Sequence, residues 1–598
     1  LGSLPREEVA FMPHKSKILP SLLQNQLIKE DGEAIPCVTQ PGILSPSDPR
    51  WKFEQTPLYH GCMKHTNPPL PFDQKYVNIA IESPSKKVMN KCKPLRVLDK
   101  DLDMKEVIFG NEIEFYDRIN FKTSSGYPYN LNIKKTKMDY INFVEDSQNK
   151  VISFSIDPSL QRDLDAKEKM RSLGIRPVTL WLDWLKDERR KASKIALPGG
   201  TRVFSLAPLD YLLHTRKYML DFGAAYMSAR FDVEAAIGIS TNGPEWSYLG
   251  NRLKSHSPYI VTGDYSDFGP QISTQIVKGV SQIVNDWYVK NSKFSQVYNN
   301  QQRSMLFEEL NPSYHVANSF VYQALCGIPS GHPLTSVVNS LSNSLYLRVF
   351  YLYATENTPF FGLDNFDKHV VLCTYGDDLI MSVSKELIEI FNCQTISEIA
   401  SRFNIKFTDA NKTGTIKYDK LENSSFLKCT FKRHPTRHND YLAPIDEVSI
   451  NECAQWVWQS SSLKMSTLEN ADQALRLAFG HGPEYFNDFK KVLNNALINA
   501  DLPQLSITWD ELDLMFFKSE VIPGSYEPLP FVKKEEEEVE KVQVDVTKNY
   551  VNLGLNDDIQ EGEVLELNGV KMFCNRIDGV LVVSQKSVSV ERPKWNWW

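Results

Sequence analysis

Two carboxylates stand side by side in Tyr375-Gly376-Asp377-Asp378, between two apolar stretches of strand composition at 369–374 and 379–383. A Gly-Asp pair between two such stretches predicts a β-hairpin with both carboxylates near its tip. Because adjacent carboxylates repel each other, the pattern favours a bound divalent cation. A solvated surface turn would give the same four residues, so this segment alone leaves both interpretations open.

A second acidic segment follows a short β-like run at 259–263, which ends at Asp264 and continues as Tyr265-Ser266-Asp267. An aspartate at the end of a buried strand can reach the tip of a neighbouring hairpin. Carboxylates from two strands can then hold two metal ions about 3.5–4 Å apart, the arrangement that supports nucleotidyl transfer. The alternative for Asp264 is a turn that simply ends the strand.

A polar stripe follows the loop at 327–335. In the segment 336–353, which has helical spacing, the stripe consists of Ser336, Asn339, Ser340 and Asn343. These residues fall at i, i+3, i+4 and i+7, which places them on one helix face. Such a face meets either a polar ligand or a closely packed neighbour, and the spacing does not decide between them.

The basic residues cluster between positions 186 and 202. This segment has only Asp187 and Glu188 as acidic residues, against Lys186, Arg189, Arg190, Lys191, Lys194 and Arg202. Such a segment can bind a triphosphate or a nucleic-acid backbone. A solvated charge run is the ordinary alternative.

One short segment has ligands that zinc prefers: His60 and Cys62 lie close to His65, and Cys92 is available as a fourth ligand. No Cys-x-x-Cys pair accompanies them. The sequence therefore favours an ordinary loop that contains two histidines, with zinc binding as the alternative.

The chain has 598 residues and a formal net charge of −7, so any nucleic-acid site must concentrate its positive charge in a groove. It has no apolar run long enough for a membrane span and no signal-peptide core. Nine widely spaced cysteines indicate a reduced, cytosolic setting. Residues 1–100 predict an extended, wrapping segment, and 101–530 predict one interlocked unit.

The composition changes after Pro530. We expect an acidic linker at 531–545 and a small β-meander within 546–598, because Asn568-Gly569 and Asp578-Gly579 separate three short apolar runs. A disordered tail with chance turn dipeptides is the alternative.

The basic segment, the strand-ending Asp264, the Ser330-Gly331 loop and the Gly-Asp-Asp hairpin occur in that order. In this order the chain resembles, over roughly residues 120–435, the RNA-dependent RNA polymerases of picorna-like positive-strand RNA viruses, of iflavirus or dicistrovirus type. Residues 407–412 resemble the motif that contains a lysine near the leaving pyrophosphate, and residues 426–431 resemble the primer-grip hairpin. The template-entry motif is matched by Thr123, Ser124, Tyr127 and Pro128.

The resemblance implies an α+β right hand with an antiparallel palm sheet, to which this chain adds the C-terminal β extension. It places the fingers at 101–230 and 276–322, joined by the N-terminal segment, the palm at 231–275 and 323–433, and the thumb at 434–530. The implied activity is template-directed RNA synthesis, a nucleotidyltransferase reaction that replicates a viral genome.

The resemblance also implies roles for individual residues. Asp264, Asp377 and Asp378 would bind Mg²⁺ or Mn²⁺, and Lys412 would act as general acid. RNA binding would fall to Thr123, Ser124, Tyr127, Pro128 and Lys428. The implied nucleotide-binding residues are Lys186, Arg190, Lys194, Arg202, Ser330, Thr335 and Asn339.

The implied partners are an RNA template and primer, ribonucleoside triphosphates, a genome-linked protein primer and other viral replication proteins. As a polyprotein product, the chain would act in the host cytoplasm at membrane-associated replication complexes.

Gly269 departs from the family pattern, because many relatives have there an aspartate that senses the ribose 2′-hydroxyl. Asp267 would face away from Asp264 if the strand continued. Two other classes stay open: a reverse transcriptase, and an RNA-binding protein without enzymatic activity.

Overall fold

The computed structural model describes residues 1–10, 12–131, 136–410 and 412–517, and three strands at 564–567, 570–577 and 580–584. The chain divides into two compact units, Leu1–Glu527 and Pro528–Trp598. The expected linker at 531–545 lies outside the described residues. No helix within the described ranges is long and apolar enough to cross a membrane.

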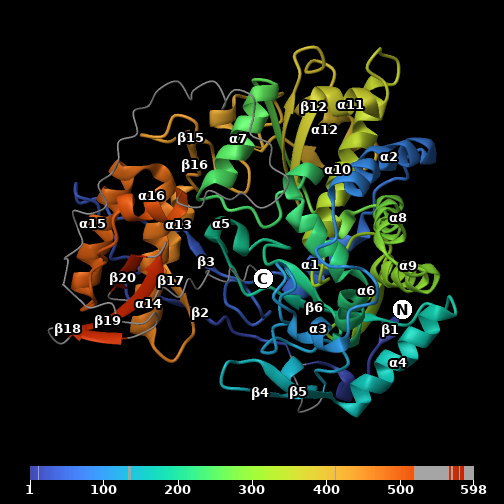
Figure 1. Ribbon diagram of the computed structural model, residues 1–598, viewed down its shortest axis with the longest axis horizontal. Helices are drawn as coiled ribbons and strands as arrows, with labels where there is room; N and C mark the ends of the chain where they lie inside the picture. Colours follow the sequence, from blue (N-terminus) through green and yellow to red (C-terminus); the bar gives the residue numbers. More distant parts are fainter. Residues whose placement is uncertain are drawn as a thin grey trace. The chain divides into compact units, whose positions relative to one another are not determined.

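A four-stranded antiparallel sheet positions the acidic residues (Figure 1). Its strand order is β12 (Val370–Tyr375), β13 (Asp378–Val383), β9 (Tyr259–Tyr265) and β14 (Phe407–Thr408). The register sets Tyr375 opposite Asp378 across a two-residue turn, and Leu379 opposite Gly263. The predicted hairpin and the strand leading to Asp264 are therefore confirmed. A Cβ on Gly263 would lie 1.9 Å from the Phe407 ring, so no side chain fits there.

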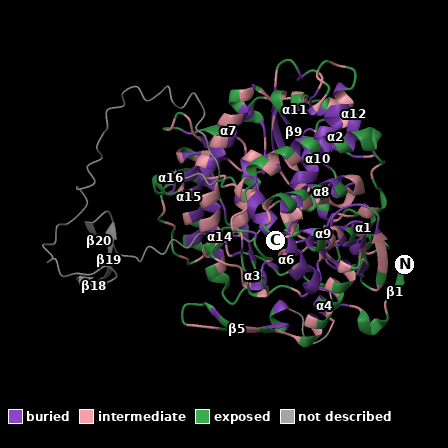
Figure 2. Cartoon of the chain, turned by 45° about the vertical axis from the view of Figure 1, so that its right-hand side comes forward, coloured by how far each residue is buried: buried purple, intermediate pink, exposed green. Residues whose placement is uncertain are grey.

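Helix α10 (Thr335–Thr355) packs against β12 and against the neighbouring helices, and Figure 2 shows it almost wholly buried. Apolar residues cover most of its circumference because protein surrounds it on nearly all sides. The neighbours are α2 (Gln74–Lys91), α8 (Thr274–Asn291), α11 (Leu363–His369) and α12 (Cys393–Arg402).

Helix α2 corrects the expectation that residues 1–100 are extended throughout. Its buried residues include Tyr76, Val77, Ala80 and Ile81, and this spacing forms one helical face. Pro84 lies inside the helix, where a proline normally argues against helical structure. Burial of the apolar face against α8 and α10 outweighs that local cost.

The remainder of the N-terminal segment does run along other parts of the first unit. It forms short antiparallel pairs with segments far away in the sequence. These pairs are β1 (Gly2–Ser3) with β11 (Phe320–Ala324), β2 (Ile18–Pro20) with β17 (Trp456–Trp458), and β3 (Thr39–Pro41) with β7 (Arg189–Lys191).

A second, five-stranded sheet has the order β1, β11, β10 (Ser313–Ala317), β6 (Leu180–Leu185) and β8 (Val203–Leu206). Only β10 and β6 pair in parallel. The basic segment lies between β6 and β8. Other elements are the hairpin β4 (Ile141–Glu145) and β5 (Val151–Ile156), and helices α1 (Pro57–Cys62), α3 (Met104–Phe109), α4 (Pro158–Ser172), α5 (Ala192–Ile195), α6 (Leu209–Ser228), α7 (Pro244–His256) and α9 (Val297–Leu310).

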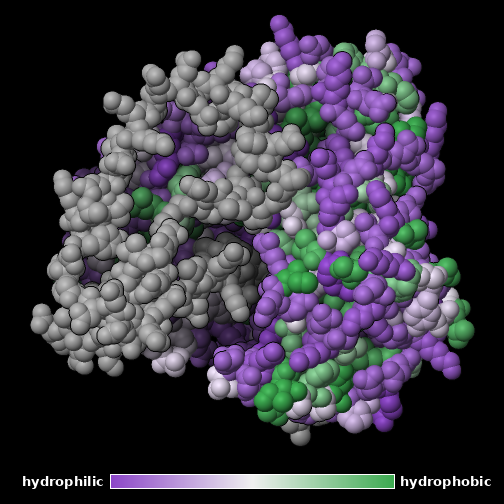
Figure 3. All heavy atoms as spheres, viewed as in Figure 1, coloured by the Kyte–Doolittle hydropathy of each residue, from purple (hydrophilic) through white to green (hydrophobic). Residues whose placement is uncertain are grey.

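The C-terminal part of the first unit has its own apolar core, which also takes in Leu23, Leu27 and Ile35 from the N-terminal segment. It follows the short pair β15 (Lys432–Arg433) and β16 (Tyr441–Leu442). Its helices are α13 (Glu447–Gln455), α14 (Leu463–Ala478), α15 (Pro483–Asn499) and α16 (Trp509–Phe517). On the face in Figure 3 the described residues form a mostly hydrophilic surface with small apolar patches.

The second unit contains an antiparallel sheet of β18 (Val564–Leu567), β19 (Val570–Ile577) and β20 (Val580–Ser584). These strands lie where the sequence predicts the β-meander. The two turn dipeptides between them lie outside the described residues.

Candidate active site

Helix α10 holds the turn between β12 and β13. The backbone N–H of Gly376 donates to Ser340 Oγ at 2.8 Å. Asn343 Nδ2 donates to the carbonyl oxygens of Gly376 and Asp377 at 3.1 Å each, and to that of Asp378 at 3.4 Å. Two of the four residues of the predicted polar stripe, Ser340 and Asn343, therefore hydrogen-bond the backbone of the acidic turn. The opening glycine has φ +64, which a residue with a side chain rarely adopts.

The three carboxylates affect one another electrostatically. Burial raises the pKa of Asp377, Asp264 raises it further, and Arg202 opposes the rise. Burial, with Asp377 and Asp264 as neighbours, raises the pKa of Asp378 to about 7, although N–H donors oppose the shift. The site therefore concentrates negative charge that a cation would stabilise.

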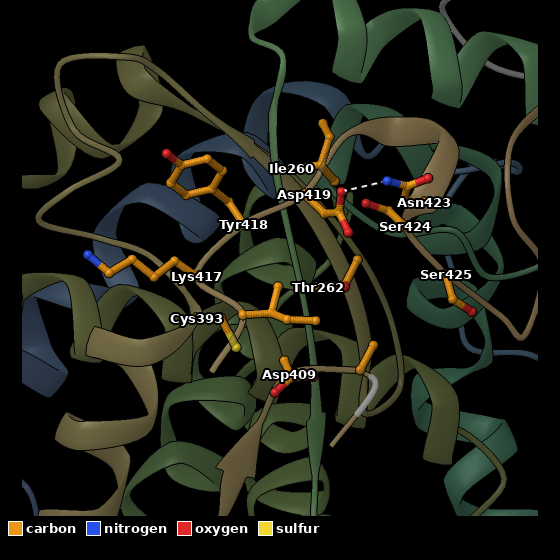
Figure 4. A pocket seen from close by; sticks show the side chains of 12 residues that line it. Ile260, Thr262, Cys393, Asp409, Lys417, Tyr418, Asp419, Asn423, Ser424 and Ser425 are labelled. Carbon is orange, nitrogen blue, oxygen red and sulfur yellow. Dashed lines mark hydrogen bonds between the residues drawn. The ribbon is translucent and has the colours of Figure 1, made fainter. Parts of the chain in front are cut away.

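Lys412 contacts this acidic centre directly: its Nζ lies 2.6 Å from Asp264 Oδ2. Its backbone is left-handed (φ +58) and its N–H donates to the carbonyl of Asp409. A small pocket lies beside this loop, between β9 and residues 416–425, and Figure 4 shows Thr262 and Asp409 among the side chains that line it. The proposed general acid is thus ion-paired with a proposed metal ligand.

The donor set fits Mg²⁺ or Mn²⁺ only in part. Carboxylate oxygens are the ligands that Mg²⁺ prefers, and such sites commonly use one or two of them together with substrate phosphates. Within the described ranges, no group of three or more His, Cys, Asp or Glu side chains is gathered for a metal. Asp264 pairs with Lys412, and Asp378 Oδ2 accepts the N–H of Leu427, so two of the three expected ligands already have a protein partner.

Three of the four predicted triphosphate-binding cations gather around Glu188. Arg202 binds it through two nitrogens, with Nε at 2.6 Å from Oε1. Lys186 and Arg190 each approach its carboxylate to 3.8 Å. Lys194 lies exposed on the short helix α5. From the sequence alone, Glu188 is one of two acidic residues among many basic ones. In the structure its carboxylate is the common partner of three of these cations.

The Ser330-Gly331 loop packs on β8. The N–H of Ser205 donates to Ser330 Oγ at 3.1 Å, and a Cβ on Gly331 would lie 2.1 Å from the carbonyl oxygen of Ser205. Thr335 donates to the carbonyl oxygens of Ser330 and residue 332, so its hydroxyl stabilises the loop. Asn339 Oδ1 is buried and accepts no hydrogen bond within the described ranges.

The segment after Asp264 departs from the expected geometry. Strand β9 ends at Tyr265, and Asp267 is left-handed with φ +56. Its carboxylate pairs with Lys64 at 2.7 Å. Strand alternation therefore does not set the direction of the Asp267 side chain, because β9 ends before it. A Cβ on Gly269 would meet nothing within 4 Å, so space does not demand the glycine.

The predicted RNA-contact residues differ in access. Thr123, Pro128 and Lys428 are exposed, and Ser124 is half-buried. Tyr127 is buried in the core with Leu182 and Val316, so its ring cannot touch RNA without leaving that core. Its packing in that core supports the loop that contains Thr123 and Pro128.

The histidine and cysteine cluster is not a metal site in the described residues. His60 packs against Trp51 and Phe53, and Cys92 is buried in another core. The Cys62 Sγ lies 3.8 Å from Asp183 Oδ2. His60 and Cys62 lie on helix α1 and His65 on the 3₁₀ turn Met63–Thr66, so this segment is helical and not the expected loop.

A buried ion pair behind the turn was not anticipated from the sequence. Arg348 of α10 binds Glu234 at 2.9 Å, and the backbone of Glu234 bonds that of Thr374 in β12. Burial alone would raise the pKa of Glu234, but Arg348 and Lys87 lower it to about 2. The available signal was Arg348 as the single charged residue of the segment 335–355.

Three comparisons place this arrangement among known proteins. The family described as viral RNA-dependent RNA polymerase matches residues 28–496. The genome polyprotein of Deformed wing virus is 35% identical over 495 residues, which cover 80% of this chain and 17% of that polyprotein. The replicase polyprotein of Acute bee paralysis virus is 29% identical over 414 residues, covering 67% of this chain and 21% of the relative. The chain thus spans about a fifth of these relatives.

Among solved structures, a Sicinivirus 3Dpol RNA dependent RNA polymerase aligns with a TM-score of 0.68. The alignment covers 86% of this chain and 98% of that one at 19% identity, so it bears on the fold alone. The expected α+β right-hand fold is confirmed.

Proposed function

The chain belongs to the viral RNA-dependent RNA polymerase family, and from this premise we propose that it adds ribonucleoside monophosphates to an RNA 3′ end under the direction of an RNA template. One observation supports this most strongly: α10 holds the Asp377 turn beside Asp264, and Arg202 interacts electrostatically with Asp377. An acidic pair facing cations is what a triphosphate and its metal ions require.

In this proposal Asp264 and Asp377 hold Mg²⁺ or Mn²⁺. When bound there, the ions would lower the pKa of the attacking hydroxyl and neutralise charge on the leaving group. The primer 3′-hydroxyl loses its proton to solvent, its oxygen attacks the α-phosphorus, and the bond from that phosphorus to the pyrophosphate oxygen breaks. Lys412 leaves Asp264 and donates a proton to a pyrophosphate oxygen.

The cations around Glu188 bind the triphosphate. Lys186, Arg190 and Arg202 exchange their contacts with this carboxylate for contacts with phosphate oxygens, which accept stronger charge-assisted bonds. Lys194 adds a longer-range charge. The role of Glu188 is to keep these cations together before the substrate arrives.

Ribose recognition falls to the loop and the start of α10. Asn339 Oδ1 is a buried acceptor in need of a donor, which a ribose 2′-hydroxyl can supply. Thr335 and Ser330 shape the same region, and Gly269 contributes no side chain.

RNA contacts are proposed for the exposed Thr123, Pro128 and Lys428 and for Ser124, with Tyr127 as their support. Base pairing with the template selects the nucleotide, so these residues read the backbone and shape. A genome-linked protein primer, other replication proteins and membrane-associated complexes in the host cytoplasm are the further proposed setting.

Primer extension on a homopolymeric RNA template tests the function. We expect incorporation of the complementary ribonucleotide with Mg²⁺ or Mn²⁺, and little incorporation of the deoxyribonucleotide. Preference for deoxyribonucleotides would indicate a reverse transcriptase. RNA binding without incorporation with either metal would indicate a binding protein.

A further inference from the structure

Residues 426–429, here called the grip turn, form a two-residue β-turn between Phe426 and Cys429. The backbone conformation of its two central residues is one that their side chains disfavour. Phe426 and Cys429 exchange two backbone hydrogen bonds of 2.9 Å. Between them, Leu427 has φ +54 and Lys428 has φ +62. Turns with two left-handed residues normally contain Asn, Asp or Gly, because other side chains disfavour this conformation. The surrounding structure must therefore hold the turn in place.

Asp378 supplies that hold at the tip of the turn. Its Oδ2 accepts the N–H of Leu427 at 2.6 Å, a short hydrogen bond. The flanks are fixed separately: Phe426 is buried, and Phe431 stacks on Trp246 with ring centroids 4.3 Å apart and planes 8° apart. The core thus anchors the first residue of the turn and the segment that follows it, and one carboxylate anchors its tip.

This contact joins two functional parts of the site. Asp378 is the first residue of β13 and directly follows Asp377, a proposed metal ligand. Lys428, at the tip of the grip turn, is exposed and available to a phosphate backbone. Asp378 follows Asp377 in the chain and is hydrogen-bonded to Leu427, the residue before Lys428. The position of Lys428 is therefore fixed relative to Asp377.

We propose that Asp378 is a positioning residue for the primer strand. Its carboxylate holds Leu427 and Lys428 in the left-handed conformation that directs Lys428 toward the primer backbone. The reacting 3′ end is thereby registered against Asp377. This inference rests on the proposed function, and it gives Asp378 a task separate from metal binding.

The test measures how long the protein retains a template–primer duplex after addition of competitor RNA, in EDTA. Without divalent cations, a role in metal binding cannot affect the result. Asp378→Ala removes the acceptor, and we expect dissociation to become about tenfold faster, as loss of a hydrogen bond to a charged group predicts. Asp378→Asn keeps an oxygen acceptor, and its dissociation rate should stay within about threefold of wild type.

Rescue distinguishes positioning from general damage. Leu427→Gly, combined with Asp378→Ala, should restore retention to within about threefold of wild type, because glycine adopts positive φ without support. If Asp378→Ala fails to fold, Asp378→Ser, whose hydroxyl is too short to reach the amide, replaces it in both measurements. Asp419→Ala is the matched control: this carboxylate accepts the Asn423 side chain at 2.9 Å in the neighbouring loop (Figure 4), and its loss should not affect retention.

Two results would overturn the inference. One is wild-type retention in Asp378→Ala; the other is fast dissociation that Leu427→Gly does not correct. Failure of the proposed function gives a different result, in which the wild-type protein extends no primer at all.

Discussion

The acidic turn and the cationic cluster around Glu188 lie on different sheets and are held in different ways. The turn is fixed by Ser340 and Asn343, two fully buried side chains that bond its backbone. The cluster depends on ion pairs in which the Arg202 side chain is 56% exposed. The acidic half is thus rigid before substrate arrives, whereas the cationic half is paired with an internal anion that phosphate can replace.

This difference has a physical reason. Charge developing in a transition state is stabilised best by groups that need not reorganise. Binding a mobile triphosphate instead requires cations that can exchange partners. Lys412 belongs with the second kind, because its ion pair with Asp264 has to open before it can reach a leaving group.

The largest effect among the supporting residues should come from Lys412. We expect Lys412→Leu to slow the chemical step by about 10²–10⁴-fold, the usual contribution of a general acid. Single-turnover incorporation measures this step apart from nucleotide binding. Lys417→Leu, which removes a lysine paired with Glu389 in the same region, is the control. An unchanged chemical rate would reduce Lys412 to a structural ion-pair partner.

Loss of Asn343 should have the next largest effect. Asn343→Ala leaves three backbone carbonyls without this donor, so the turn should loosen and kcat should fall by about 10²-fold with little change in KM. Steady-state extension kinetics measure both. Ser342→Ala, on the same helix and without a hydrogen-bond partner in the described residues, should behave as wild type. Equal rates for the two variants would show that the turn does not need α10.

Substitutions among the cations around Glu188 should have a smaller effect, on KM rather than on kcat. Arg202→Ala should raise the KM for nucleotide by about tenfold while kcat falls less, because a charge-assisted contact to the substrate is lost. Lys191→Ala removes the same charge from the neighbouring strand β7 and serves as the matched control. A fall in kcat at constant KM would place Arg202 with the rigid half instead.

Stability should show a modest dependence on pH through buried histidines. Burial lowers the pKa of His65 and His214 to about 4 each, and that of His332 to about 3. Below pH 6.5 the unfolded chain binds protons that the folded chain does not, so the free energy of unfolding falls as the pH falls. From pH 7.5 to 5.5 each histidine should cost about 1.4 kcal/mol of stability, and Asp378, whose pKa burial raises to about 7, offsets part of that loss. Denaturant titrations at pH 7.5, 6.5 and 5.5 measure it. Stability that stays constant over this range would contradict the burial of neutral histidines.

The sequence predicts local structure well where a short pattern decides it. The hairpin around Gly376 and the strand that contains Asp264 follow from short apolar runs bounded by turn residues. Helix α2 was missed because Pro84 argues locally against a helix, and packing against distant helices overrides that argument. The end of β9 at Tyr265 likewise depends on a left-handed Asp267 and its distant partner Lys64.

The candidate site shows the same division. Residue types and order indicate Asp264, Asp377 and the cations, but no local pattern reveals that Glu188 gathers three of them. The contact between Asp378 and Leu427 joins positions 49 residues apart through a backbone amide, which no side-chain motif encodes.

The most direct test of the central claim is single-nucleotide incorporation by preformed enzyme–RNA complexes of the Asp264→Ala and Asp377→Ala variants. The account predicts that each variant loses at least about 10³-fold in incorporation rate, while template–primer affinity and thermal unfolding stay near wild type. Incorporation near the wild-type rate in either variant would contradict the assignment of this acidic pair to the chemistry.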